Sequence, residues 1–260
     1  MRTCTKSGAA GLALAMALVA GAFAADPAKA PAPPPKPPAA LPQPEDVLRA
    51  MSKFLAAQKA FSYHGEVEFD QILPGGPKIR LSGAVDIAVS RPGSLFVDYR
   101  DDVSDRVVWL QNGLLTIFDP VAQTYAQISG PKDIDGMVEK LEKEYGMSLP
   151  LGEFAESDPY AVLTRGIDLA HYVGVHNVDG MFSHHVLLQR RDLDLQIWIQ
   201  VGAKPLPRRL VFEYPEQVGQ PQYEVTITDW TLKAPKPEIF APKIPKGAAK
   251  VGFLPIGENR

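Results

Sequence analysis

The sequence is almost without cysteine: its single cysteine is Cys4. Cys4 precedes an apolar stretch, in a segment that we expect to be absent from the mature protein. The chain that remains has no thiol, which excludes disulfides, cysteine-based metal sites and a cysteine nucleophile. The position of Cys4 also excludes a lipidated cysteine at the predicted cleavage point.

Long hydrophobic runs are also missing. The longest, residues 9–23, is shorter than the roughly 20 residues that span a bilayer. It follows two basic residues and ends in the small-x-small pattern Ala22-Phe23-Ala24. This layout predicts a signal peptide over residues 1–24, cleaved before Ala25, and a periplasmic protein that is not an integral membrane protein. The alternative is an uncleaved membrane anchor.

Basic charge is too sparse for a nucleic-acid-binding protein. The chain has 27 Lys and Arg against 30 Asp and Glu, a net charge of −3. Loss of Arg2 and Lys6 with the leader leaves 25 basic and 30 acidic residues, a net charge of −5. A mildly acidic protein without a basic tract is not expected to bind nucleic acid.

Two common catalytic motifs are missing as well, because the sequence contains no G-x-S-x-G and no H-E-x-x-H. Acidic pairs, Asp101-Asp102 and Asp192 with Asp194, are candidates for general acid-base chemistry, but we interpret them as solvated edges. The sequence therefore predicts no catalytic residue, no cofactor and no enzyme. The competing hypothesis is a hydrolase with a hidden site near His184 and His185.

The five histidines do not form a metal-binding motif. His171 and His176 are five residues apart in one predicted strand, which predicts opposite faces, and the adjacent His184 and His185 also diverge. His64 falls on the polar face of another strand. Zinc needs three or four converging ligands. Cross-strand pairing can still bring the two groups together, but we interpret them as surface or hydrogen-bonded histidines and predict no metal site.

Proline is concentrated in residues 26–44, where nine of 19 residues are proline. Such a segment favours polyproline II and cannot bury a core. We interpret residues 25–44 as a linker between the leader and a folded domain at 45–260. The alternative is a proline-rich ligand for another protein.

The rest of the chain shows two hydrophobic periods. Apolar residues at helical spacing predict helices over 44–61 and 132–145. Period-two alternation between turn pairs such as Asn112-Gly113 predicts strands. The predicted strands are 62–72, 78–89, 95–100, 106–110, 114–119, 123–128, 170–178, 181–190, 193–201, 208–214 and 223–232.

These elements predict a mainly β (α+β) fold. About eleven consecutive strands with tight turns favour one antiparallel sheet, and a flat sheet of that size is unusual. We expect the sheet to curl into an open half-barrel whose apolar concave face is plugged by the two helices.

The apolar face of this sheet is the candidate binding surface. One interpretation is a core packed directly against the helices. The other is a core with spare volume for an acyl chain, since each buried methylene contributes about 0.8 kcal/mol. The candidate residues are Phe69, Leu81, Val85, Val97, Tyr99, Leu195, Ile197 and Ile199. Trp198 falls on the opposite, polar side, where we predict that the C-terminal tail covers it; the alternative is a contact surface.

Several short motifs carry a family resemblance through their order. They are Arg91-Pro92-Gly93 before a strand, Asn112-Gly113 and Asp119-Pro120 in the central hairpins, Leu206-Pro207-Arg208 at a late strand, and Ile244-Pro245-Lys246-Gly247-Ala248 near the end. With them the chain resembles the LolA and LolB superfamily of lipoprotein carriers, which includes the sensor domain of RseB-type regulators. It resembles more closely a group of predicted periplasmic bacterial proteins, over about residues 45–250.

The resemblance implies an open β-barrel with a helical lid, whose relatives hold lipid chains in the concavity. It implies a non-enzymatic periplasmic protein that binds the lipid or acyl part of an envelope molecule, including a lipoprotein, as a carrier or chaperone. The alternative is an RseB-like sensor or interaction module with an envelope protein partner. The chain differs from LolA in its proline linker and from LolB in lacking a lipobox cysteine.

Overall fold

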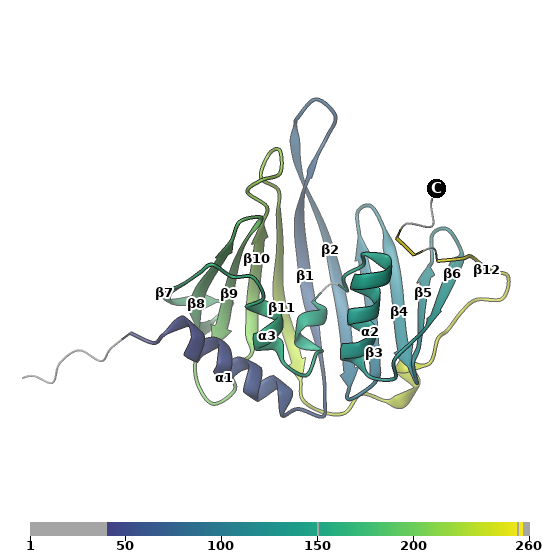
Figure 1. The fold of residues 1–260 in the computed structure, drawn as a ribbon, viewed down its shortest axis with the longest axis horizontal. Coiled ribbons are helices and arrows are strands. Elements are labelled where there is room, and N and C mark those ends of the chain that lie inside the picture. Colours follow the sequence, from purple (N-terminus) through teal and green to yellow (C-terminus); the bar gives the residue numbers. More distant parts are fainter. Residues whose placement is uncertain (1–40, 150, 254, 257–260) are drawn as a thin grey trace, which may run out of the picture. The chain divides into compact units, whose positions relative to one another are not determined.

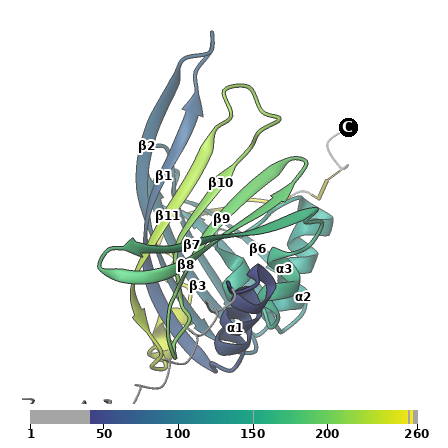
Figure 2. The same ribbon diagram turned by 90° about the vertical axis from the view of Figure 1, so that its left-hand side faces the viewer.

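The computed structural model describes residues 41–149, 151–253 and 255–256. The predicted signal peptide and nearly all of the proline-rich linker lie outside the described residues. Within them, twelve strands form a single sheet, and the three α-helices lie on one side of it (Figures 1 and 2).

All eleven predicted strands are present, and a short twelfth strand was not predicted. The strands are β1 (Ala60–Ile72), β2 (Lys78–Ser90), β3 (Ser94–Asp101), β4 (Asp105–Gln111), β5 (Leu114–Asp119), β6 (Thr124–Ser129), β7 (Leu169–Val178), β8 (Met181–Arg190), β9 (Leu193–Gln200), β10 (Pro207–Glu213), β11 (Gln222–Thr231) and β12 (Ala249–Lys250). The helical elements are α1 (Pro44–Ala56), α2 (Ile134–Lys140), the π-helical turn η1 (Leu141–Tyr145), the 3-10 turn η2 (Gly152–Phe154), α3 (Pro159–Leu163) and the 3-10 turn η3 (Pro237–Phe240).

The sheet consists of two meanders joined at β1. Its strand order is β12-β6-β5-β4-β3-β2-β1-β11-β10-β9-β8-β7. The chain runs from β1 to β6 across one half, crosses the face through the helical segment, and returns from β7 to β11, which pairs with β1. Neighbouring strands are antiparallel except β12, which pairs in parallel with β6. The sheet does not close, since β12 and β7 are its two ends, so the predicted open, mainly β fold is confirmed.

Helix α1 covers the β7–β9 side of the concave face. Its apolar residues Leu48, Met51 and Leu55 are completely buried, and it contacts α3, β7 and β9. The predicted extension of this helix to Phe61 is wrong. The helix ends at Ala56 because Phe61 already belongs to the period-two pattern of β1, where its side chain is buried in the core.

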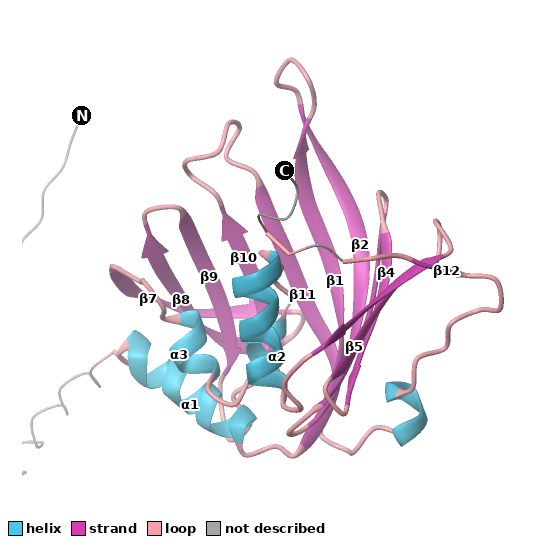
Figure 3. Ribbon diagram, turned by 45° about the vertical axis from the view of Figure 1, so that its right-hand side comes forward, coloured by secondary structure: helices cyan, strands magenta, loops and turns pink. Residues whose placement is uncertain are grey.

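The second predicted helix forms as α2 followed by η1. Asp133 caps α2 by accepting a hydrogen bond from the Gly136 backbone N–H at 2.8 Å. The apolar stripe of Ile134, Met137 and Leu141 is buried, as the helical spacing predicted. Figure 3 shows α2, α1 and α3 on the same face of the sheet, so the predicted helical plug is present.

The C-terminal tail follows the other face and the β6 edge. Its turn η3 contacts β3 and β4, and Phe240 is buried there. Farther along, the Ala249 backbone N–H donates to the Gln123 carbonyl at 2.9 Å and the Val251 N–H to the Tyr125 carbonyl at 2.8 Å. The tail therefore pairs with an edge that would otherwise be open.

Trp198 is not covered by the C-terminal tail, so that prediction is wrong. The register places His185 directly opposite Trp198, and the two rings stack with centroids 3.9 Å apart. Val178 and Val211 complete a small apolar cluster around the indole, and the Arg209 guanidinium lies 5.2 Å from its centroid. The cover of Trp198 thus comes from neighbouring strands of the same sheet.

Candidate ligand-binding pocket

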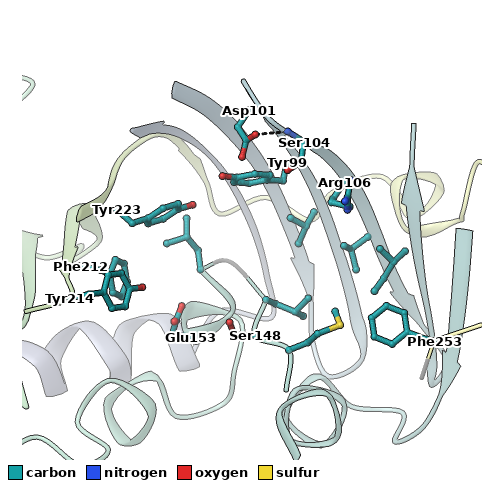
Figure 4. A pocket seen from close by; sticks show the side chains of 16 residues that line it. Tyr99, Asp101, Ser104, Arg106, Ser148, Glu153, Phe212, Tyr214, Tyr223 and Phe253 are labelled. Atoms are coloured by element: carbon teal, nitrogen blue, oxygen red, sulfur yellow. Dashed lines mark hydrogen bonds between the residues drawn. The ribbon is translucent and has the colours of Figure 1, made fainter. Parts of the chain in front are cut away.

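A pocket of about 720 Å³ lies between the concave face of the sheet and the segment that follows η1 (Figure 4). Pockets for small molecules usually measure about 300–1,000 Å³. Strands β3–β5 form one wall, and β10 and β11 form another. The remaining sides are closed by residues 147–149, Leu151, Glu153 and Phe253.

The wall from β3–β5 is apolar because one register row of the sheet faces inward there. Val97 pairs with Val108, and Val108 pairs with Ile117, so the three side chains form a continuous row across the strands. Met147 and Phe253 also line this part of the pocket. The Phe253 ring packs edge-on against Tyr145, with centroids 5.3 Å apart. This row offers a surface for an unbranched hydrocarbon chain.

The wall from β10 and β11 is aromatic. Phe212 and Tyr223 are direct cross-strand partners, and their rings meet edge-on with centroids 6.1 Å apart. Tyr214 and, from β3, Tyr99 also line the pocket. Burial is the main cause that raises the pKa of Tyr223 to about 12, so its hydroxyl stays protonated at neutral pH.

Residues 147–149 and 151–154 approach the sheet closely and form the inner wall. Leu149, Leu151 and Phe154 are buried, and the Tyr63 hydroxyl donates to the Leu151 carbonyl at 3.3 Å. Gly65 lies beneath this segment and is packed between Val85 and Val225 of the neighbouring strands. A Cβ there would lie 3.0 Å from a Val225 methyl carbon, tighter than ordinary packing permits.

Arg91 anchors the end of the same segment. Its Nη2 donates to the carbonyl oxygens of Phe154 at 3.2 Å and Glu156 at 2.7 Å. Hydrogen bonds from a charged donor contribute about 1.5–3 kcal/mol, so this side chain fixes an otherwise irregular piece of backbone. The sequence predicted neither a helix nor a strand here and did not indicate a wall of a pocket.

Glu153 places a carboxyl group in the pocket wall. Its Oε2 is buried and has no hydrogen-bond partner among the described residues. Burial raises the pKa of Glu153, and the nearby Glu142 raises it further. Glu153 also affects three tyrosines, Tyr63, Tyr214 and Tyr223. Burial is the main cause of their raised pKa values, and the charge of Glu153 adds to it.

The rim toward the β3–β4 turn is polar. One oxygen of Asp101 accepts the backbone N–H groups of Val103 at 2.7 Å and Ser104 at 2.6 Å. Arg106 forms an ion pair with Asp119, with 2.8 Å between Nη1 and Oδ2. Asp101 therefore lies at the edge of the strand and caps the β3–β4 turn at the pocket rim.

The eight residues predicted for the binding surface are divided between the pocket and the packed core. Val97 and Tyr99 line the pocket. Phe69 is partly buried with its ring 6.4 Å from that of Tyr223, and Leu81 lies opposite Phe69 in the β1–β2 hairpin. The other four are fully packed in the core: Val85, Leu195, Ile197 and Ile199. Ligand contact by any of the eight stays a prediction.

The main residues that sequence reasoning missed are Glu153, Phe212, Tyr214 and Tyr223. The three aromatic residues lie in or beside predicted strands, and the alternation from Leu210 to Phe212 and Tyr214 was a usable signal for one inward face. Glu153 gave no signal, because a single acid in an irregular segment is normally solvated.

The histidines form hydrogen-bonded pairs. His176 and His185 lie with their Nδ1 atoms 3.1 Å apart, and His184 Nδ1 is 2.9 Å from the Tyr172 hydroxyl. The prediction that His171 and His176 face opposite sides is wrong, because a β-bulge between Tyr172 and Gly174 shifts the register of β7. No group of three potential metal ligands occurs within the part of the chain that the structure describes.

Fold and pocket together define a half-barrel protein with an open concavity. The chain belongs to the family described as "Predicted periplasmic protein (DUF2092)", whose model matches residues 44–254, and it is a periplasmic protein. No protein in the comparison with curated sequences matches it. Among the helices of the described residues, none combines the length and apolar character needed to cross a bilayer.

The chain is also similar to solved structures, at low sequence identity. An uncharacterized conserved protein from Thermus thermophilus has 8% identity and a TM-score of 0.50, covering 80% of this chain and 98% of that one. LprF from Mycobacterium bovis has 14% identity and a TM-score of 0.41, covering 79% and 97%. The LolA superfamily protein NE2245 from Nitrosomonas europaea has 10% identity and a TM-score of 0.39, covering 78% and 99%. The predicted resemblance to a family of periplasmic bacterial proteins is confirmed by the family match.

Proposed function

We propose that this periplasmic protein binds the acyl part of an envelope lipid or lipoprotein in the pocket, without catalysing a reaction on it. The observation that carries the proposal is the 720 Å³ space that lies beside the apolar register row and is not filled by the helices. A core that existed only for stability would be expected to fill this space, because protein interiors pack nearly as densely as organic crystals.

The energetics suit reversible binding. Burying eight methylene groups at about 0.8 kcal/mol each contributes roughly 6 kcal/mol before the entropic cost of association. The sides of the pocket that do not belong to the sheet are formed by residues 147–149, Leu151, Glu153 and Phe253, so these are the parts that move when a chain enters. Binding and release then need only a displacement of this segment.

Two variants of one strand test the proposal. Val108→Phe fills the pocket from β4, whereas Val107→Phe adds the same ring to the opposite face of the same strand. We expect the wild-type protein and Val107→Phe to retain co-purified lipid in native mass spectrometry and to bind a fluorescent acyl probe. Val108→Phe should lose both while keeping its circular dichroism spectrum. Absence of lipid and probe binding in the wild-type protein would refute the proposal.

A second candidate function, a protein-interaction module, rests on the free edge of the sheet. Strand β7 ends the sheet and exposes Leu169, Val173 and Val175, and Phe182 on β8 is 66% exposed. An exposed apolar edge strand is a template for pairing with another chain. Cross-linking in cells from position 175 should then capture an envelope protein, and an equivalent cross-linker at exposed Val218 should not.

A further inference from the structure

The aromatic end of the pocket contains an acidic group without a counter-ion. Glu153 Oε2 is buried and unpartnered among the described residues, and Figure 4 shows this carboxyl group together with the rings of Phe212, Tyr214 and Tyr223. The unsatisfied atom costs stability in the empty protein, because burying an unpaired polar group is unfavourable. A ligand in the pocket that donates a hydrogen bond to this oxygen would explain why the protein leaves it without a partner.

The charges around the pocket favour a cation over an anion. Three charged side chains line it: Asp101, Glu153 and Arg106. Arg106 is already paired with Asp119 at 2.8 Å, so its charge is compensated. The two remaining carboxylates make the pocket acidic, and an anionic headgroup such as a free fatty acid would meet like charge beside Glu153.

The rings beside Glu153 are also suited to a cation. Ammonium groups bind over the faces of aromatic rings, and cages of such rings recognise quaternary ammonium ligands. Phe212, Tyr214, Tyr223 and Tyr99 supply four rings at this end of the pocket. The cation–π pairs within the described residues involve Tyr160, Phe61 and Trp198 instead, so no protein cation is recorded over the four rings.

We infer that the pocket is selective for an amphiphile with an ammonium headgroup, which pairs with Glu153 and lies among the tyrosines. The inference rests on the proposed acyl binding and names the class of ligand. The hydrocarbon chain extends along the row formed by Val97, Val108 and Ile117, at the opposite end of the pocket from the headgroup. An apolar wall for the tail and an acidic aromatic wall for the head thus define the orientation of the ligand.

Three ligands with the same twelve-carbon chain test the inference on the full mature chain. Dodecylamine, dodecanol and dodecanoate are compared below their micelle concentrations by displacement of a neutral acyl probe. We expect the amine to bind about tenfold tighter than the alcohol, as one charge pair and a cation–π contact allow, and the carboxylate to bind weakest.

Glu153→Gln should remove most of the preference for the amine over the alcohol, since the change removes the charge and keeps the size of the side chain. Glu156→Gln is the matched control: it makes the same change three residues along the same segment, outside the pocket lining, and should keep the full preference. Butylamine and spermidine, which carry ammonium groups without a long chain, should not displace the probe.

The outcomes separate this inference from the proposed function. Binding of all three dodecyl ligands with no preference for the amine, or an amine preference that survives in Glu153→Gln, would overturn the inference and leave acyl binding intact. Tighter binding of dodecanol or dodecanoate than of the amine would overturn it as well, in favour of a protonated Glu153 that donates to the ligand. Displacement by spermidine would overturn it by identifying a free amine as the ligand. Failure of every dodecyl ligand would remove the proposed function itself.

Discussion

The two halves of the sheet have the same alternation of inward and outward residues, but one half is packed as core and the other lines a pocket. Under β7–β9, helices α1 and α3 fill the concave face, and Ile197 and Ile199 are completely buried. Under β3–β5, the chain crosses the face as α2, η1 and an irregular segment, and a pocket remains beside Val108 and Ile117. The alternation of apolar residues therefore shows which side chains face inward. Whether these side chains form packed core or line a pocket depends on which part of the face the helices cover.

The largest expected effect compares one isoleucine from each half. Ile197→Ala removes a fully packed side chain and should lower the free energy of unfolding by about 3–4 kcal/mol. Ile117→Ala only enlarges an existing pocket and should cost about 1–2 kcal/mol, because no new closed cavity forms. Urea unfolding monitored by circular dichroism measures both. Equal losses would show that the β3–β5 half is packed as tightly as the other.

Gly65 lies on β1, between the two halves of the sheet, and tests how tightly the neighbouring strands pack there. Gly65→Ala places a methyl group 3.0 Å from Val225 and 3.1 Å from Val85, and should destabilise the protein by about 1–3 kcal/mol through overpacking. Gly76→Ala, in the exposed β1–β2 turn at a positive φ, is a control for backbone strain alone. Restoration of stability by Val225→Ala in the Gly65→Ala background would identify the clash as the cause.

On the pocket side of the sheet, the buried carboxyl group of Glu153 is expected to make the stability of the protein depend on pH. Its pKa is raised in the folded state by burial, so the unfolded chain ionises first as pH rises. Glu153→Gln should therefore stabilise the ligand-free protein by about 1 kcal/mol at neutral pH. This gain in stability should vanish at pH values below the ordinary glutamate pKa. It should reach a constant value above the raised pKa that Glu153 has in the folded protein. A gain that is independent of pH would contradict this account.

The smallest effect is expected on the convex face, which belongs to neither packed core nor pocket. The hydrogen bond to Asp86 is the main cause that raises the pKa of His64, and Glu66 adds to it. This stabilisation is complete below the ordinary histidine pKa and is lost as pH rises through the raised value. It should amount to a few tenths of a kcal/mol, because the pair is partly exposed. Unfolding of His64→Gln and wild type at about pH 5 and about pH 9 measures the difference.

Sequence patterns predicted the sheet far better than the pocket. Period-two alternation and turn pairs located eleven strands because they depend on local backbone preferences. They missed β12, which has only two residues and owes its conformation to the β6 edge. The end of α1 was misplaced because Phe61 fits both the helical stripe and the strand alternation.

The candidate site was predicted only in part because it depends on long-range packing. Val97 and Tyr99 were selected correctly as inward-facing, but so were Ile197 and Ile199, and no local pattern shows that α1 covers the second pair. Glu153 lines the pocket because its segment lies against the sheet, where Arg91 donates to the Phe154 carbonyl and Tyr63 donates to the Leu151 carbonyl. Such contacts join residues more than 60 positions apart, which a local period does not encode.

Paramagnetic broadening by a spin-labelled acyl chain is the most direct test of the central claim. A long-chain alcohol carrying a nitroxide near its middle is added to the isotopically labelled protein, and amide signals are followed by NMR. We predict saturable broadening at Val108 and Ile117 and unchanged signals at Val186 and Ile197, on the packed half. Equal broadening in both halves, or none that saturates, would contradict the account.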